Sequence, residues 1–220
     1  CSMSAPEEAH GSYFDQAAST WDDDPRRLAR AELVATAIRA RIPISSDWAA
    51  IEIGAGTGLL SRCLAADLGP ILLVDSSHGM TQVTAQRLAR AGDTQQRVRC
   101  LDLARDRLDP AEGRFQIAYS LLAFHHVTDV GGLLRAIVDL LEPHGWVAVC
   151  DLAAEDGSFH GPDCGEPVHH GFSDDQLIDA AVAAGLEQVA VETIAAIDRR
   201  GPDGTVRNYP LLLLTGRSPG

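Results

Sequence analysis

The pattern of apolar and polar positions along the chain changes repeatedly between two spacings. Short, nearly continuous apolar runs are typical of buried strands, and apolar residues that recur every three or four positions are typical of helices. The runs predict strands over residues 48–54, 71–75, 97–103, 115–122 and 145–152, with later ones near 187–197 and 209–215. The helical spacing predicts helices over residues 25–42, 58–69, 80–91, 130–141 and 173–185. Asp24 before Pro25, and Ser173 three residues before Gln176, are capping signals for the first and last helix.

The order of these elements predicts an α/β fold. Apolar strands that alternate with helices indicate a parallel sheet covered on both faces, and right-handed crossovers make it doubly wound. The last two predicted strands have no helix between them, so a hairpin should place the final strand antiparallel to its neighbours. We therefore expect a mostly parallel, seven-stranded, Rossmann-like sheet with an antiparallel C-terminal strand.

Composition and charge exclude several classes of function. The chain has 220 residues, of which 45% are apolar, and a net charge of −13. An acidic surface repels phosphate backbones, so we expect no nucleic-acid partner. All 18 basic residues are arginine, which excludes a Schiff-base lysine and a P-loop. No apolar run is long enough to span a bilayer and no signal peptide is recognised, so we expect a cytoplasmic protein that binds no membrane.

The five cysteines do not indicate a disulfide framework. Cys63 lies in a helical pattern, whereas Cys100 and Cys150 lie in strand patterns. We expect buried free thiols in a reducing compartment. Cys164 is the exception, because its neighbours indicate a loop.

A glycine-rich turn joins the first predicted strand to the next helix. Gly54, Gly56 and Gly58 alternate there, and glycine lets a backbone approach a ligand closely. Asp75 ends the second predicted strand and Asp102 the third, at the sheet edge where such folds bind ligands. The carboxylates can accept hydrogen bonds from a ribose and an adenine amino group. The pattern favours an adenosine-bearing ligand, although a tight strand–helix turn alone would also use glycine.

The glycine spacing separates two classes of adenosine ligand. Dinucleotide sites use G-x-G-x-x-G, but here the third glycine comes one residue early, and Leu59 stands where that pattern needs Gly or Ala. The segment EIGAGTG resembles the first motif, E/D-x-G-x-G-x-G, of class I S-adenosylmethionine-dependent methyltransferases. The segments VDSSHGM and SLLAFHHVTDV resemble the small-molecule branch, which includes the ubiquinone- and menaquinone-biosynthesis type. The segment LDL resembles the adenine-contact motif, and the final hairpin is similar to the antiparallel seventh strand of the family. The resemblance extends from about residue 13 to residue 215.

The resemblance implies S-adenosyl-L-methionine as the cofactor. Glu52 would orient its amino group, Asp75 would hold the ribose, and Ser120 would sit below the sulfonium. The implied cofactor-binding residues are Glu52, Gly54, Ala55, Gly56, Gly58, Asp75, Ser76, Met80, Asp102, Leu103 and Ser120. The family often has Asp where this chain has Gln116, and we expect that departure to alter a structural contact.

The implied reaction is methyl transfer to an O, S, N or C nucleophile. Enzymes that methylate nitrogens in nucleic acids and proteins often carry Asn/Asp-Pro-Pro-aromatic after the fourth strand, where this chain reads SLLAF. With the acidic charge, this indicates a small-molecule acceptor. A non-catalytic protein that binds S-adenosylmethionine or S-adenosylhomocysteine is an alternative, and the glycine spacing disfavours an NAD-dependent oxidoreductase. The oligomeric state is left open.

Two histidines and an aromatic N-terminal segment are further candidates. His125 and His126 follow the fourth predicted strand and are candidate catalytic bases, with local packing as the other interpretation. Three aromatic residues, Tyr13, Phe14 and Trp21, could form either an apolar staple for the first helix or a lid over the cofactor. The resemblance favours the lid, so we expect a lid or cap over residues 1–24 and the methyltransferase domain over residues 25–220.

A histidine-rich loop, residues 157–172, follows the fifth predicted strand. His160, Cys164, His169 and His170 supply enough donors for zinc, with Asp151 or Glu155 in reach, but their spacing matches no closed zinc module. We expect the loop to line the acceptor pocket without a metal, because loops at this sheet edge are positioned for function. The expected pocket residues are Tyr13, Trp21, His160, His169 and His170. A solvated loop is the remaining interpretation.

Overall fold

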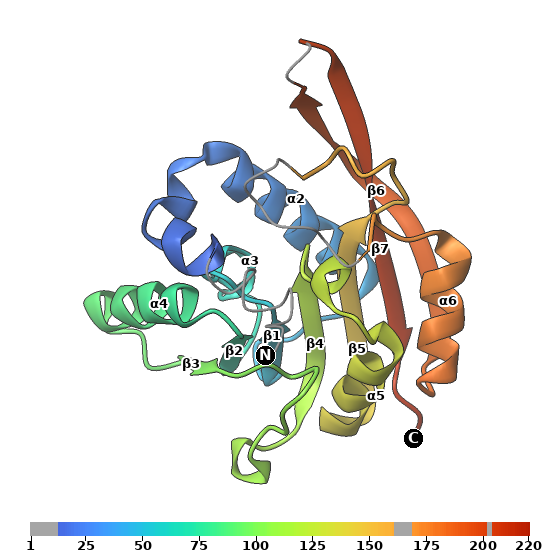
Figure 1. Ribbon diagram of the computed structural model, residues 1–220. Coiled ribbons are helices and arrows are strands. Elements are labelled where there is room, and N and C mark those ends of the chain that lie inside the picture. Colours follow the sequence, from blue (N-terminus) through green and yellow to red (C-terminus); the bar gives the residue numbers. More distant parts are fainter. Residues whose placement is uncertain (1–12, 161–168, 202–203) are drawn as a thin grey trace, which may run out of the picture.

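The computed structural model describes residues 13–160, 169–201 and 204–220. Seven strands form one sheet in the order β3-β2-β1-β4-β5-β7-β6 (Figure 1). The strands are β1 Ala50–Ile53, β2 Ile71–Asp75, β3 Gln96–Cys100, β4 Phe115–Leu121, β5 Leu141–Leu152, β6 Glu187–Arg200 and β7 Val206–Arg217. The helices are η1 Ala18–Asp23, α2 Pro25–Arg41, α3 Leu59–Leu64, α4 His78–Ala91, η2 Pro110–Glu112, η3 Phe124–His126, α5 Val130–Leu140 and α6 Asp174–Ala183.

The predicted fold class is confirmed. Strands β1 to β5 pair in parallel, and β7 pairs antiparallel with both β5 and β6. The β6–β7 hairpin is longer than the apolar pattern predicted and projects beyond one end of the sheet (Figure 1). Most of the extra length lies in polar, exposed residues such as Asp198, Arg199 and Arg207, which the apolar pattern does not mark.

The sheet is buried on both faces, because successive side chains of a strand point to opposite sides. Leu73 and Tyr119 belong to a core with residues of α2 and α3. Leu72 and Ile51 belong to the opposite core, with residues of α5 and α6. This burial explains why the central strands read as nearly continuous apolar runs.

Local capping follows the predicted signals. Asp24 accepts a hydrogen bond from the N–H of Arg26, and Ser173 forms a capping box with Gln176. The amide oxygen of Gln116 accepts the N–H of Ala49 at 2.7 Å, so this side chain makes a structural contact. None of the described helices combines the length and the apolarity needed to cross a bilayer.

Two predictions about the edge strand are wrong. β3 ends at Cys100, so Asp102 lies in the following loop and not at the strand end. Cys100 is exposed, whereas Cys63 is half-buried and Cys150 is buried, and all three thiols are free. The reason is that β3 borders only β2, so most of its side chains contact solvent. Cys164 lies outside the described residues.

Candidate active site

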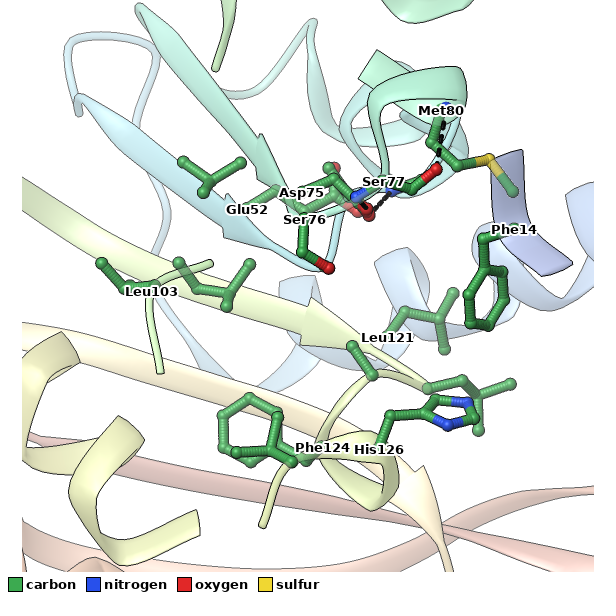
Figure 2. Close-up of a pocket in the computed structure, with 18 of the residues that line it drawn as sticks. Phe14, Glu52, Asp75, Ser76, Ser77, Met80, Leu103, Leu121, Phe124 and His126 are labelled. Atoms are coloured by element: carbon green, nitrogen blue, oxygen red, sulfur yellow. Dashed lines mark hydrogen bonds between the residues drawn. The ribbon is translucent and has the colours of Figure 1, made fainter. Parts of the chain in front are cut away.

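A cavity of about 870 Å³ opens at the carboxyl ends of β1, β2 and β4 (Figure 2). β1 pairs with β2 on one side and with β4 on the other, so the cavity lies where the strand order reverses. Open α/β sheets bind ligands at such a point. The volume is in the range of small-molecule and cofactor sites.

The glycine loop after β1 forms one wall of the cavity. Gly54 and Gly56 line it, with φ of 65° and 55°. A Cβ on Gly54 would lie 2.2 Å from the Cβ of Ala123, so only glycine fits at this position. Gly58 does not line the cavity, because its Cβ position points at Leu73, 2.7 Å away, inside the fold. The third glycine therefore serves helix–strand packing.

Asp75, at the end of β2, is tied to the glycine loop. Its Oδ2 accepts the N–H of Gly56 at 2.7 Å, and its Oδ1 accepts the N–H of Ser77 at 2.8 Å. Burial raises the pKa of Asp75, against the lowering effect of these two bonds. Each carboxylate oxygen can accept a further hydrogen bond, and the side chain faces the cavity beside Ser76 and Met80 (Figure 2).

Glu52 lines the same wall and is only 2% exposed. Its Oε2 accepts hydrogen bonds from both the N–H and the hydroxyl of Ser61. The Ser61 hydroxyl also lies 2.7 Å from the hydroxyl of Tyr119. Burial raises the pKa of Glu52 to about 8. The carboxyl group is therefore protonated at neutral pH when no ligand is bound.

Replacing Glu52 with glutamine is expected to weaken the dependence of stability on pH. The folded pKa of about 8 lies above the ordinary value of 4.5, so the folded chain keeps a proton that the unfolded chain releases. Stability is then full below the unfolded pKa and falls by about 1.4 kcal/mol per pH unit as the pH rises towards the folded pKa. Urea unfolding across this window measures the slope. Exposed Glu32→Gln is the control. Equal slopes in the two variants would contradict the buried, protonated state.

Asp102 and Leu103 line the cavity from the loop after β3. Ser120 is placed differently from the expected position below a sulfonium. It is buried in β4, its hydroxyl donates to the carbonyl of Ile53 at 2.8 Å, and it is not among the described residues that line the cavity. Its side chain links β4 to β1 within the sheet.

The N-terminal segment covers one side of the cavity. Phe14 and Trp21 line it, whereas Tyr13 packs edge-on against Phe14 at 5.3 Å without reaching the described wall. Asp15 accepts hydrogen bonds from the Ser77 hydroxyl at 2.6 Å and the Gly79 N–H at 2.7 Å. These bonds hold the segment against the start of α4.

Two arginines that the sequence reasoning missed also line the cavity, from α2. The guanidinium group of Arg27 lies 3.6 Å from the ring centroid of Trp21 and donates a hydrogen bond to the backbone carbonyl of Trp21 at 2.5 Å. Burial lowers the pKa of Arg30, and no acidic side chain in the described part of the chain forms an ion pair with it. The available signal was their spacing of three residues, which puts both on one side of a helix that follows an aromatic segment.

Of the two adjacent histidines, His126 lines the cavity beside Phe14, at 5.4 Å between ring centroids (Figure 2). His125 is buried behind it. The Nδ1 of His125 lies 2.6 Å from Oδ1 of Asp151, whose other oxygen accepts the N–H of Phe124 at 2.8 Å. Asp151 therefore holds the His125 ring in one orientation.

The histidines of the loop after β5 do not line the cavity wall as expected, so far as the structure describes it. His160 lies against the adjacent pair, with its Nε2 3.3 Å from Nε2 of His125. His169 approaches the carbonyl of Val127 at 3.0 Å through its own Nε2. His170 is exposed and lies 3.6 Å from Glu155. The three rings thus have separate partners among the described residues, and Cys164 lies outside them.

Comparisons with known proteins agree with this arrangement. Residues 50–145 match the model of a methyltransferase domain family. An uncharacterized methyltransferase of Schizosaccharomyces pombe, C1347.09, is 27% identical in an alignment of 158 positions that covers 66% of this chain and 56% of that protein. The chain therefore spans little more than half of that relative.

Two solved structures share the fold. A putative methyltransferase of Haloferax volcanii, in complex with the Trm112 methyltransferase activator, superposes with a TM-score of 0.77 and 21% identity, covering 94% of this chain and 98% of that one. The 1,6-didemethyltoxoflavin-N1-methyltransferase of Burkholderia thailandensis, with its substrate and S-adenosylhomocysteine bound, has a TM-score of 0.69 and 17% identity, covering 100% and 93%.

Proposed function

We propose that this chain, which carries an S-adenosylmethionine-dependent methyltransferase domain, transfers the methyl group of that cofactor to a small-molecule nucleophile. The observation that carries the proposal is one cavity with two kinds of wall. Glycine backbone and buried carboxyl groups line the ends of β1 and β2, whereas Phe14, Trp21 and His126 line another side. In Figure 2, Leu103 lies away from Phe14 and His126, and all three line the same cavity of about 870 Å³.

The cofactor would lie along the first wall. Gly54, Ala55 and Gly56 would border its methionine part, and Asp75 would accept hydrogen bonds from the ribose hydroxyls. Ser76, Met80, Asp102 and Leu103 would surround the adenine, a set that the cavity lining supports.

Charge matching supports a position for the amino-acid end of the cofactor. Its ammonium group needs an acceptor, and the cavity wall offers the buried carboxyl group of Glu52, whose ionised form the bound ammonium would favour. Its carboxylate needs a cation, and Arg30 lines the cavity without forming an ion pair to a described residue, although the charge of Asp24 acts on it. A partly buried cation is costly unless a ligand supplies the opposite charge.

Replacing Arg30 with methionine is expected to weaken S-adenosylhomocysteine about 10- to 100-fold, because a hydrogen bond to a charged group contributes about 1.5–3 kcal/mol. Affinity for 5′-methylthioadenosine, which lacks the amino-acid end, should stay within about twofold of wild type. Calorimetric titration with both ligands measures the difference. Exposed Arg90→Met is the control. Equal losses for both ligands would show that Arg30 acts on the fold and not on the carboxylate.

The chemistry asks little of the protein beyond alignment and loss of a proton. A lone pair of the acceptor forms a bond to the methyl carbon while the carbon–sulfur bond breaks. The electron pair of the broken bond stays on the sulfur, which turns the sulfonium into a neutral thioether. A hydroxyl or thiol acceptor must also lose its proton. We assign promotion of that loss to His126, which faces the cavity. Its ring packs against that of His125, which Asp151 orients.

Turnover with a panel of small hydroxyl, thiol, amine and carbon nucleophiles tests the proposal, with release of S-adenosylhomocysteine as the readout. The expected result is turnover of one chemical class, with competitive inhibition by S-adenosylhomocysteine. Tight cofactor binding with no turnover across the panel would favour the non-catalytic binder. A salt-sensitive shift of duplex DNA or structured RNA would contradict the small-molecule acceptor, since the net charge of −13 opposes such binding.

A further inference from the structure

Three imidazole rings meet at the rim of the cavity. His125 and His126 come from η3, and His160 comes from the loop after β5. One ring nitrogen from each lies within 4.8 Å of the other two. The Nε2 atoms of His125 and His160 are 3.3 Å apart. Two nitrogen ligands of a tetrahedral zinc ion, each about 2.0–2.1 Å from the metal, are separated by roughly 3.3–3.4 Å.

The protonation of His125 is compatible with metal binding. Its Nδ1 lies 2.6 Å from the carboxylate of Asp151, which is fully buried, so the Nδ1–H group donates a hydrogen bond to that carboxylate. The lone pair of His125 is then on Nε2, the atom that faces His160. A carboxylate that orients a histidine through its second nitrogen is the usual support for a metal ligand.

We propose that His125, His126 and His160 bind one divalent transition-metal ion, with Zn²⁺ as the first candidate. Imidazole suits zinc, and three histidines leave a fourth tetrahedral position for a further ligand. Because His126 lines the cavity, the metal site borders the space assigned to the acceptor.

The proposal rests on the proposed function for its consequence, though not for metal binding itself. A hydroxyl or thiol bound to the ion loses its proton to solvent near neutral pH. The resulting anion can attack the methyl carbon, and the methylated product binds the ion more weakly and leaves. The acceptor class is therefore a small molecule with a hydroxyl or thiol that coordinates zinc. In this mechanism His126 acts through the metal and not as a direct base.

This ligand set differs from the one that the loop sequence presents. His169 and His170 have other partners, at Val127 and Glu155. That difference supplies a matched control, because His160 and His170 belong to the same loop but only His160 belongs to the cluster.

The experiment uses the full chain without an affinity tag. After treatment with a chelator and dialysis, Zn²⁺ is titrated in competition with a chromophoric chelator, and Co²⁺ is added separately to follow its tetrahedral absorption bands. Wild type is expected to bind about one equivalent. His160→Ala and His126→Ala should weaken Zn²⁺ more than about 100-fold, whereas His170→Ala should match wild type. Asp151→Asn should weaken it about 10- to 100-fold, and S-adenosylhomocysteine binding reports whether that variant folds.

The outcomes separate the metal site from the proposed function. No stoichiometric Zn²⁺ in wild type, or equal affinity in His160→Ala and His170→Ala, would overturn the metal site. Full turnover of an acceptor after removal of the metal would also overturn its role while leaving methyl transfer in place. Zinc binding without any cofactor binding would leave the metal site standing and reject the methyltransferase function.

Discussion

Replacing Gly56 with aspartate is expected to reduce the affinity for S-adenosylmethionine and S-adenosylhomocysteine more than about 100-fold. A side chain on residue 56 would enter the cavity, where the nearest atom to its Cβ is the sulfur of Met80 at 4.0 Å. It would also bring a second carboxylate close to Asp75, which accepts the residue 56 N–H at 2.7 Å. The substitution thus fills the space and adds a charge at the wall proposed for the cofactor.

Gly92→Asp is the matched control for this loss. Gly92 caps α4 with a φ of 63°, close to the 55° of Gly56, and nothing lies within 4 Å of its Cβ position. Both variants therefore carry a similar backbone cost, about 1 kcal/mol, for a side chain at positive φ. Calorimetric titration and thermal unfolding of the pair separate binding from stability. Equal ligand affinity in the two variants would reject the assignment of the cavity.

Replacing His126 with alanine is expected to lower kcat by about 100- to 10,000-fold, the usual contribution of a group that promotes proton loss from a reacting atom. Its ring faces the cavity 5.4 Å from Phe14 and packs 4.1 Å from His125, which Asp151 orients. Affinity for S-adenosylhomocysteine should stay within about twofold of wild type, because the proposed cofactor wall lies at β1 and β2.

The kinetic measurement for His126 uses saturating cofactor and whichever acceptor the panel identifies. His144→Ala, an exposed histidine in β5 outside the described cavity wall, should keep wild-type kcat. A His126→Ala enzyme with kcat within twofold of the control would exclude the ring from proton loss, whether directly or through a metal.

Most of the fold could be predicted from local signals. Buried central strands are apolar on both faces, so β2 and β4 stand out as runs, and capping residues such as Asp24 and Ser173 mark helix starts. The prediction was wrong where burial was one-sided. β3 is an edge strand with mostly exposed side chains, so its end, and the exposure of Cys100, could not be read from the pattern.

The glycine loop and its carboxyl groups were also predictable, because a short segment contains them. Gly54, Gly56 and Asp75 line the cavity as the sequence suggested. Gly58 and Ser120 do not, since packing decides whether a side chain at a strand end or turn faces the ligand space or the interior. Their roles in the cofactor site are not supported by their positions.

The sequence by itself determined the succession of strands and helices along the chain, the glycine turn and the place of Asp75 at the end of β2, because each depends on residues close together in the chain. Only the tertiary structure decided that Arg30 faces the cavity and that His160 contacts His125. His169, from the same loop as His160, contacts Val127 instead. The reason is that β4 and β5 are neighbours in the sheet, so the segments after them share one edge although 35 positions separate the two rings. Such contacts depend on strand order and side-chain direction, which spacing along the chain does not contain.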